Sequence, residues 1–273
     1  MTKSKIRYSE AMAEAMRRMP RIQKRKQGFY ETYIKRGMDI ICSMLAIVVF
    51  SWLYLGVAVL VKVKLGSPVL FKQLRPGMAD PETGRETFFY MYKFRSMSDE
   101  TDAGGQLLPD EARLGGFGKW LRSTSLDELP EAFNILRGDM SIIGPRPQLV
   151  RDMAFMSPRQ RMRHTAKPGL SGLAQINGRN AIRWEDKLEW DLQYIKQVTL
   201  KNDVFILLQT IQKAFIVREG ITGGGRPTAE DFGDYLLNQG KVTQKEYDDR
   251  KELAERIVKE YQSDFANRKG MAE

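Results

Sequence analysis

An uncharged apolar run near the N-terminus constrains the fold more than any other feature of this sequence. Residues 40–61 are 22 consecutive positions without a charged side chain. At about 1.5 Å per residue, a helix of that length is long enough to cross the hydrocarbon layer of a membrane. A cleaved signal peptide does not fit, because the run begins late and no small-residue cleavage site follows it. We predict a membrane-embedded helix, with a buried helix of a soluble protein as the alternative.

Basic residues flank this run on both sides. Lys35 and Arg36 precede it, and four Lys or Arg residues follow it by position 75. A helix that crosses once should show asymmetric flanks, whereas one that dips in and returns need not. We therefore expect a re-entrant helix over residues 30–64. Arg36 and Asp39 lie three apart and are predicted to pair at the membrane edge.

Length and charge bound the rest of the molecule. The 273 residues suit one large domain or one domain with appendages, and 29% charged residues argue against a polytopic membrane protein. The net charge of +10 favours polyanionic partners: nucleic acid, an anionic membrane face or phosphorylated substrates. The single cysteine, Cys42, excludes an intrachain disulfide and a cysteine-built zinc site.

The N-terminal segment, residues 1–29, is basic. Met12, Met16 and Met19 recur at helical spacing with arginines between them. This pattern predicts an amphipathic helix lying on a membrane surface, and a disordered basic tail is the alternative.

Residues 65–218 read as one catalytic domain of the α+β class, mostly helical, with a small β-hairpin. Residues 69–71 and 87–92 are strand-like, and Pro76-Gly77 and residues 80–84 resemble turns. Residues 98–118 are polar and glycine-rich and are expected to form a loop. Helical patterns dominate from residue 119 onward.

The composition changes after Gly223, which opens an appendage within residues 219–273. Thr228-x-x-Asp231 and Thr243-x-x-Glu246 are capping signatures. They predict a helical hairpin over about residues 229–264. We expect it to serve in packing or in forming a homodimer.

The adjacent acids Asp127 and Glu128 are the strongest candidates for chemistry. Ser125-x-x-Glu128 also fits a capping box, so a plain helix start is the alternative. Pro130 would interrupt that register, whereas a helix starting at Asp127 keeps the proline inside the first turn. Neighbouring carboxylates can divide the work, one as nucleophile and metal ligand and the other as proton relay or positioning group.

Three further segments carry polar residues suited to phosphate. Arg146 stands between two prolines, so its guanidinium is held on a stiff backbone. Lys93 and Arg95 alternate on one strand, although such cations are commonly only exposed surface charges. A glycine-rich stretch over residues 167–172 allows close backbone approach to a ligand, and an elaborate turn is its alternative. The only histidine, His164, has no nucleophile motif beside it and is expected to be structural.

Taken in order along the chain, these segments resemble the bacterial sugar transferase family, the monotopic phosphoglycosyl transferases, over roughly residues 30–217. The motifs that carry the resemblance are Lys35-Arg36-x-x-Asp39, Phe71-x-Gln73-x-Arg75-x-Gly77, Tyr92-Lys93-Phe94-Arg95, Ser125-Leu126-Asp127-Glu128-Leu129-Pro130, Gly138-Asp139-Met140-Ser141, Gly144-Pro145-Arg146-Pro147, and Pro168-Gly169 through Asn177-Gly178-Arg179. The short N-terminal region resembles the subclass that has only the catalytic domain.

The resemblance implies transfer of a sugar-1-phosphate from a nucleotide diphosphate sugar, expected to be a UDP-sugar, to a polyprenol phosphate such as undecaprenyl phosphate. Asp127 would attack the β-phosphate to form a covalent phosphosugar ester, with Mg²⁺ at Asp127 and Glu128 as relay or positioning group. Such a step starts capsule, O-antigen, exopolysaccharide or glycoprotein glycan assembly at the cytoplasmic face of the bacterial inner membrane. The residues expected to bind substrate or phosphate are Lys93, Arg95, Arg122, Arg146, Gln175, Asn177, Arg179 and Asp191.

One departure from the family concerns the helix break. The family usually has Ser-Pro in mid-helix, whereas this chain has Ser51-Trp52. A serine side chain that bonds back to the preceding turn bends a helix less reliably than proline does. Two other classes of function remain as alternatives: an inactive membrane scaffold of the same fold, and a nucleic-acid-binding protein. The intact acid pair disfavours the first. The placement of prolines, glycines and acids disfavours the second, so we expect no nucleic acid partner.

Overall fold

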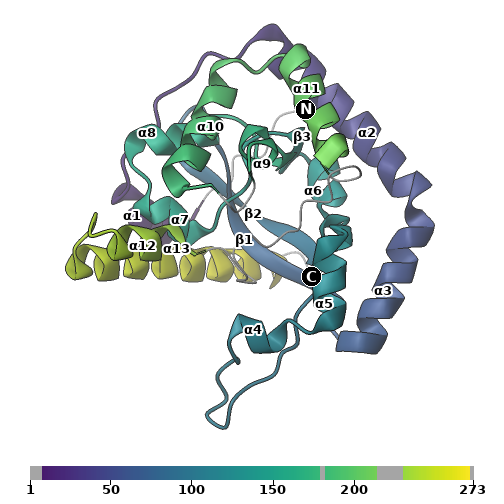
Figure 1. Cartoon of the computed structure of the whole chain (residues 1–273). Helices are drawn as coiled ribbons and strands as arrows, with labels where there is room; N and C mark the ends of the chain where they lie inside the picture. The colour runs from purple at the N-terminus through teal and green to yellow at the C-terminus, as the bar shows by residue number, and fades with distance from the viewer. Residues whose placement is uncertain (1–7, 179–181, 214–229, 271–273) are drawn as a thin grey trace.

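The computed structural model describes residues 8–178, 182–213 and 230–270, and within them the protein is mostly helical around one antiparallel hairpin (Figure 1). Strand β1 (Leu70–Ala79) pairs with β2 (Glu86–Phe94). The predicted hairpin is confirmed, and the turn over residues 80–84 is closed by a bond from the Asp80 amide to the Arg85 carbonyl at 2.8 Å. The predicted turn at Pro76-Gly77 is wrong. These residues lie inside β1, where the register shifts between Pro76 and Ala79.

The apolar run forms a bent pair of helices. A π-helical turn (Tyr30–Ile34) leads into α2 (Lys35–Val49), and α3 (Ser51–Leu65) follows after a single residue. The two helices meet at an angle of 64°, and Phe50 at the break has φ −97° and ψ 16°. No single helix in the described parts of the chain is long and apolar enough to cross a membrane, but this bent pair is when taken together. The predicted break at Ser51 therefore lies one residue from the observed one.

The sequence motif before the apolar run docks α2 on the rest of the protein. Arg36 donates to the carbonyl oxygens of Ile135 and Leu136 at 2.6 and 2.7 Å. The Asp39 carboxylate accepts from the Ser141 hydroxyl at 2.9 Å and from the Ile142 amide at 3.0 Å. The predicted Arg36–Asp39 pair is thus wrong. Both side chains find buried partners on the catalytic domain, which outcompete an exposed ion pair of little energy.

The N-terminal segment forms the predicted helix, but not at a free surface. Helix α1 (Glu10–Arg17) buries Met12 and Met16, and Met19 is buried just beyond it. These methionines belong to one apolar cluster with Leu74 and Phe88 of the hairpin and Ile257 of α13. The prediction that this face lies on a membrane is therefore wrong, because protein side chains cover it.

The C-terminal appendage is the helical hairpin that the capping signatures predict. It consists of α12 (Phe232–Asn238) and α13 (Gln244–Gly270), which continues beyond the predicted end. Thr243 and Glu246 form the expected reciprocal cap, with the Thr243 amide donating to Glu246 at 2.9 Å and the Glu246 amide donating to the Thr243 hydroxyl at 3.3 Å. Thr228 lies outside the described residues. Figure 1 shows α13 running beneath the hairpin, beside α1 and α7.

The central part of the chain holds short helices between the hairpin and the last helices of the domain. In order, these elements are α4 (Asp110–Arg113), α5 (Gly116–Ser123), a 3₁₀ turn (Leu126–Glu128), α6 (Glu131–Arg137), β3 (Ser141–Ile143), α7 (Val150–Phe155), α8 (Pro158–Arg161), a second 3₁₀ turn (Met162–Thr165), β4 (Gly169–Ser171), α9 (Leu173–Ile176), α10 (Trp184–Lys196) and α11 (Leu200–Gln212). The stretch predicted as a loop, residues 98–118, thus also contains α4 and the start of α5.

The glycines predicted to admit a ligand instead let two backbone segments touch. Strands β3 and β4 form a short parallel pair, which the sequence reading missed. A Cβ added to Gly169 or Gly172 would collide with the backbone of Gly144. The close approach therefore fastens the segment that carries Arg146 to the segment after Lys167.

Candidate active site

The two adjacent acids lie in a tight turn that leads into α6. Ser125 has a left-handed backbone, with φ 56°, and its side chain makes no capping bond, so the capping box is not formed. The 3₁₀ turn places Asp127 and Glu128 before Pro130, which is the N-cap residue of α6. The α-helix therefore starts at Glu131, not at Asp127 as predicted. Pro130 still occupies a position where no intrahelical donor is needed.

Five charged side chains gather around this turn, and we call them the Asp127 cluster: Lys93, Asp127, Glu128, Glu131 and Arg146. The Lys93 ammonium lies 2.7 Å from Glu128 Oε1 and 3.2 Å from Glu131 Oε1. Glu128 Oε1 also accepts from Arg146 at 2.6 Å. Lys93 from β2 and Arg146 from the loop after β3 thus share one carboxylate oxygen. The structure brings together four residues that the sequence singled out and one, Glu131, that it did not.

Asp127 is the carboxylate of this cluster without a fixed partner. It is 7% exposed, and no hydrogen bond or ion pair joins its carboxylate to any part of the chain that the structure describes. Burial and the charge of Glu128 raise the pKa of Asp127 to about 6, although Lys93, Arg122 and Arg146 act in the opposite direction. A carboxylate that is buried, uncommitted and close to cations is suited to attack an electrophile that carries phosphate.

The other two acids have opposite environments. Burial alone would raise the pKa of Glu128, but the charges and hydrogen bonds of Arg146 and Lys93 outweigh it and lower that pKa well below its usual range. Burial raises the pKa of Glu131 to about 7, against the charge of Lys93 and together with that of Glu128. Glu128 is therefore a fixed anion, whereas Glu131 is poised to exchange a proton near neutral pH.

Arg146 is held from behind by a buried pair. Arg163 donates to the Arg146 carbonyl at 2.5 Å and to the Asp191 carboxylate at 2.6 and 2.9 Å. Asp191 is 1% exposed. We expected Asp191 among the substrate-binding acids, but its burial and its pairing with Arg163 place it as a support for the Arg146 backbone.

Of the other residues predicted to bind substrate, one acts on the Asp127 cluster and another is bound elsewhere. Arg122 of α5 donates to the Ser96 hydroxyl at 3.0 Å, and its charge acts on Asp127. Arg95 is buried and donates at 2.5 Å to Asp99 and at 3.1 Å to the Ser67 carbonyl, so its guanidinium is committed away from the Asp127 cluster.

Two predicted side chains on and just after α9 bond locally. Gln175 donates to the Leu170 carbonyl at 3.1 Å and Asn177 to the Leu173 carbonyl at 2.8 Å, with no contact to the Asp127 cluster. Arg179 lies outside the described residues.

Sequence reasoning missed two members of the site. Glu131 lies four residues after Asp127, a spacing that puts two side chains on one helical face, and this signal was available. Arg75 on β1 has its pKa lowered to about 10 by burial and by the charge of Arg146, against the charges of nearby acids that include Glu131. In the sequence, Arg75 stands out only as part of the motif Phe71-x-Gln73-x-Arg75-x-Gly77, which indicates no role for it.

A second buried group of charges adjoins the support of Arg146, and we call it the Glu86 cluster: Glu86, Arg161 and His164. His164 Nε2 lies 3.4 Å from the Arg163 guanidinium. Arg161 donates to both Glu86 oxygens, at 2.8 and 2.5 Å, and His164 Nδ1 lies 3.0 Å from Oε1. Arg161 also donates to the Pro20 carbonyl at 2.6 Å. His164 therefore holds the fold together, and the prediction that it is structural is confirmed.

The Asp127 cluster fits only one mode of Mg²⁺ binding. In the parts of the chain that the structure describes, no group of three or more acid, histidine or cysteine side chains forms a metal cage. Mg²⁺ is often held by one or two carboxylates together with substrate phosphates and water. Asp127, the uncommitted carboxylate, suits that mode, because Glu128 is already bound by two cations.

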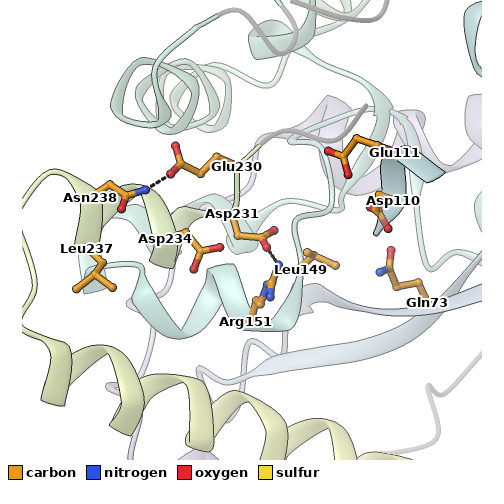
Figure 2. Close-up of a pocket in the computed structure, with 10 residues that line it drawn as sticks. All are labelled: Gln73, Asp110, Glu111, Leu149, Arg151, Glu230, Asp231, Asp234, Leu237 and Asn238. Carbon is orange, nitrogen blue, oxygen red and sulfur yellow. Dashed lines mark hydrogen bonds and ion pairs between the residues drawn. The ribbon is translucent and has the colours of Figure 1, made fainter. Parts of the chain in front are cut away.

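A polar cavity of about 700 Å³ lies between the hairpin, the start of α7 and α12 (Figure 2). Its acidic lining residues are Asp110, Glu111, Glu230, Asp231 and Asp234. Figure 2 shows Arg151 reaching Asp231 and Asn238 reaching Glu230. Gln73 also lines the cavity and accepts from Arg75 at 2.5 Å, so the two sites are neighbours without sharing a residue of the Asp127 cluster. The surplus of carboxylates makes this cavity a poor phosphate site.

Comparison with known proteins identifies the family of this chain. A family model described as bacterial sugar transferase matches residues 30–217. The chain is 43% identical over 199 residues to the uncharacterized sugar transferase EpsL of Bacillus subtilis, a match that covers 73% of this chain and 95% of that protein. It is 41% identical over 188 residues to the UDP-N-acetylgalactosamine-undecaprenyl-phosphate N-acetylgalactosaminephosphotransferase of Aeromonas hydrophila, covering 66% of this chain and 43% of that protein. It is 40% identical over 192 residues to the UDP-glucose:undecaprenyl-phosphate glucose-1-phosphate transferase of Klebsiella pneumoniae, covering 67% of this chain and 40% of that protein. The chain thus matches less than half the length of the last two relatives.

Proposed function

Because the chain belongs to the bacterial sugar transferase family, we propose that it transfers a sugar-1-phosphate from a UDP-sugar to a polyprenol phosphate and so starts the assembly of a glycan. The printed names of the relatives from Aeromonas and Klebsiella describe this reaction for those proteins. The observation that carries the proposal for this chain is the uncommitted Asp127 carboxylate beside a fully engaged Glu128.

In the first step an Asp127 oxygen attacks the β-phosphorus of the donor. The bond from that phosphorus to the bridging oxygen breaks, and nucleoside monophosphate leaves with the bridging oxygen and its electron pair. In the second step a phosphate oxygen of the polyprenol phosphate attacks the phosphorus of the aspartyl ester, and Asp127 regains its carboxylate. Two successive displacements at one nucleophile divide a difficult transfer into two easier steps.

The cations of the site support binding of the phosphate groups. Arg146 is half-exposed, its side chain is bound to Glu128 and its backbone is held by Arg163. Little rotational freedom of the side chain therefore remains to be lost when the guanidinium binds a phosphate. Lys93 has a third ammonium proton beyond those facing Glu128 and Glu131. Glu128 fixes both cations, which supports a positioning role for it. Bound Mg²⁺, held by Asp127 and the substrate phosphates, would supply further charge neutralisation.

The bent helix pair supports a re-entrant anchor, with both ends on the cytoplasmic face. At one end Arg36 binds carbonyl groups of α6, and at the other Val57 and Val61 pack with Phe94 and Leu121. A helix that crossed the membrane once would separate its two ends by the thickness of the bilayer. Between these docked ends both helices expose a row of large apolar side chains, which comprises Ile41, Met44, Leu45, Val48, Val49, Phe50, Trp52, Leu55, Val59, Leu60 and Val63.

Helix α11 adds a second apolar surface near the start of α2. Its exposed apolar side chains are Leu200, Val204, Phe205, Leu207, Leu208 and Ile211. Asp203 of α11 accepts from Tyr30 at 2.8 Å and also pairs with Lys35, which ties the two helices together. A patch of this kind on a protein surface favours contact with lipid, in agreement with a monotopic enzyme.

Release of nucleoside monophosphate tests the reaction. The full chain in detergent is incubated with Mg²⁺ and a panel of UDP-sugars, with and without undecaprenyl phosphate, and the release of UMP is measured. Without acceptor, intact-mass analysis should find one phosphosugar added per chain. Asp127→Asn should abolish both signals, whereas Glu255→Gln on the exposed side of α13 should leave them unchanged. Turnover by Asp127→Asn at the wild-type rate would refute the covalent mechanism, and lack of UMP release with every donor would favour an inactive scaffold.

Cysteine labelling tests the topology. In a Cys42→Ser background, Lys26→Cys and Lys64→Cys place single thiols on the two sides of the helix pair. We expect both thiols to resist a membrane-impermeant reagent added outside intact cells and to react after lysis. Reaction of only one thiol from outside would exclude re-entry, and reaction of both would exclude the cytoplasmic face.

A further inference from the structure

We propose that Glu131 takes up a proton when the donor diphosphate binds, and thereby releases Lys93 toward the phosphate. This inference rests on the proposed function and adds to it a residue with a positioning role. Glu131 acts through Lys93 and is not itself placed in contact with the substrate.

The geometry of Lys93 is the first support. Its ammonium lies between two carboxylates, at 2.7 Å from Glu128 and 3.2 Å from Glu131. Glu128 keeps a second cation, Arg146, at 2.6 Å whether Lys93 stays or turns away. Within the described chain, Lys93 is the only cation that forms an ion pair with Glu131. Rotation of Lys93 toward a phosphate would therefore leave Glu128 paired and Glu131 unpaired.

The burial of Glu131 is the second support. Its side chain is 2% exposed, and within the described residues its Oε1 has only the 3.2 Å ion-pair contact with Lys93 and no further hydrogen bond. A buried carboxylate that loses its one counter-ion among the described residues is strongly destabilised, so it binds a proton instead. The protonated carboxyl group is neutral, so its burial away from water costs much less than burial of the carboxylate.

No other nearby charge replaces Lys93 as the counter-ion of Glu131. The charged groups that act on Glu131 are Lys93 from β2, Glu128 from the 3₁₀ turn, Arg146 from the loop after β3 and Arg75 from β1. Glu128 opposes ionisation, and Arg146 is already bound to Glu128. Arg75 donates to Gln73 and to the Pro147 carbonyl. An arriving diphosphate brings further negative charge, which makes ionised Glu131 still less favourable.

Proton uptake on binding is directly measurable. The probes are UDP-glucose and UDP-N-acetylgalactosamine with Mg²⁺, and the protein is the full chain in detergent carrying Asp127→Asn. This change prevents turnover and removes the other carboxyl group of the Asp127 cluster whose pKa burial raises. Binding heats at pH 8 are compared in two buffers of different ionisation enthalpy, for this variant and for Asp127→Asn/Glu131→Gln. We expect uptake of about one proton in the first and close to none in the second. Adding Glu255→Gln in place of Glu131→Gln should leave the uptake unchanged.

Each outcome decides the matter. Binding without proton uptake, or with equal uptake in both variants, overturns the inference and leaves the proposed function standing. If neither nucleotide binds and the wild-type chain releases no UMP, the proposed function fails and this inference with it.

A second measurement does not depend on the double variant. With Asp127 intact, the KM of the wild-type enzyme for the donor should rise from pH 7 to pH 9 by up to about tenfold per pH unit. The KM of Glu131→Gln should change little over this range. A purely structural role would lower activity at all pH values equally and would contradict the proposal.

Discussion

The Asp127 cluster and the Glu86 cluster are both buried groups of opposite charges, and they differ in how completely the charges are matched. Every Glu86 oxygen is bound, and the third guanidinium nitrogen of Arg161 donates to the Pro20 backbone carbonyl. In the Asp127 cluster, Asp127 has no hydrogen bond or ion pair within the described residues, and Glu131 Oε1 is held only by its 3.2 Å contact with Lys93. The first cluster resists change because any movement breaks a bond. The second can rearrange around a ligand because its bonds are shared or missing.

The protonation of the two clusters follows from this difference. Burial alone would raise the pKa of Glu86, but the hydrogen bonds from His164 and Arg161 lower it to about 2. In the Asp127 cluster, incomplete pairing lets burial raise the pKa of Asp127 to about 6 and of Glu131 to about 7. Full pairing thus fixes one charge state, whereas partial pairing keeps two charge states within reach at neutral pH.

The largest expected effect is loss of activity in the Asp127 cluster without loss of fold. Asp127→Asn should lower UMP release by at least about a thousand-fold, because it removes the nucleophile. The midpoint of urea unfolding at pH 8 should stay equal or increase, since a poorly compensated buried charge is removed. A variant that lost both activity and stability would show that Asp127 is structural, and the contrast between the clusters would fail.

The next effect is loss of fold in the Glu86 cluster. Glu86→Gln should lower the free energy of unfolding by about 3–5 kcal/mol, because it leaves Arg161 buried without its counter-ion. Urea denaturation measures this. Glu189→Gln, which breaks the exposed pair with Arg159, is the control and should cost at most about 1 kcal/mol. Equal costs for the two changes would mean that burial adds nothing to the Glu86 cluster.

Low pH should remove the stabilisation that the Glu86 cluster provides. Because the folded-state pKa of Glu86 is lower than its ordinary value of 4.5, its charge stabilises the protein above about pH 4.5, and this contribution of about 3 kcal/mol disappears as the pH falls toward 2. Burial lowers the pKa of His164, so that group also makes acidification destabilising. The difference in unfolding free energy between wild type and Glu86→Gln should therefore shrink as the pH falls from 4.5 to 2. A difference that stays constant would contradict a low pKa for Glu86.

The smallest effect has the opposite sign. Glu131→Gln should raise the free energy of unfolding by about 1–2 kcal/mol above pH 7, because the raised pKa means that ionised Glu131 destabilises the folded state. Below about pH 4.5 the carboxyl is neutral in both the folded and the unfolded state, and the gain should vanish. Thermal unfolding across this pH range measures the change in stability. Destabilisation of Glu131→Gln at pH 8 would mean that Glu131 is a fully compensated ion, as Glu86 is.

The sequence predicts those parts of the site whose arrangement depends on residues next to one another in the chain. Asp127 and Glu128 share one turn, and the prolines around Arg146 restrict it wherever it is placed. The strand pattern of Lys93 also fits a plain surface charge, and only the structure shows that it faces two acids. The hairpin and the C-terminal helices also followed from alternation, turn residues and capping signals.

Partners far apart in sequence account for most errors. The spacing of Arg36 and Asp39 permits a pair, but it says nothing of the α6 carbonyls and β3 groups that compete for them. Asp191 meets Arg163, 28 positions away, and this contact decides its burial. The helix that carries Met12 and Met16 was correctly predicted as amphipathic, although a pattern of apolar residues does not distinguish lipid from protein as the covering surface.

The packing of α1 against α13 has a consequence for biosynthesis. Met16 is translated about 240 residues before Ile257, with which it shares an apolar cluster. At a bacterial rate of about 20 residues per second, α1 waits on the order of 10 s for this partner. During that interval α2, α3 and the hairpin have left the ribosome, and the methionine face of α1 still lacks the part of its cover that α13 provides. Protection of this face therefore comes late, and a chain whose synthesis stops before α13 leaves it exposed to chaperones and proteases.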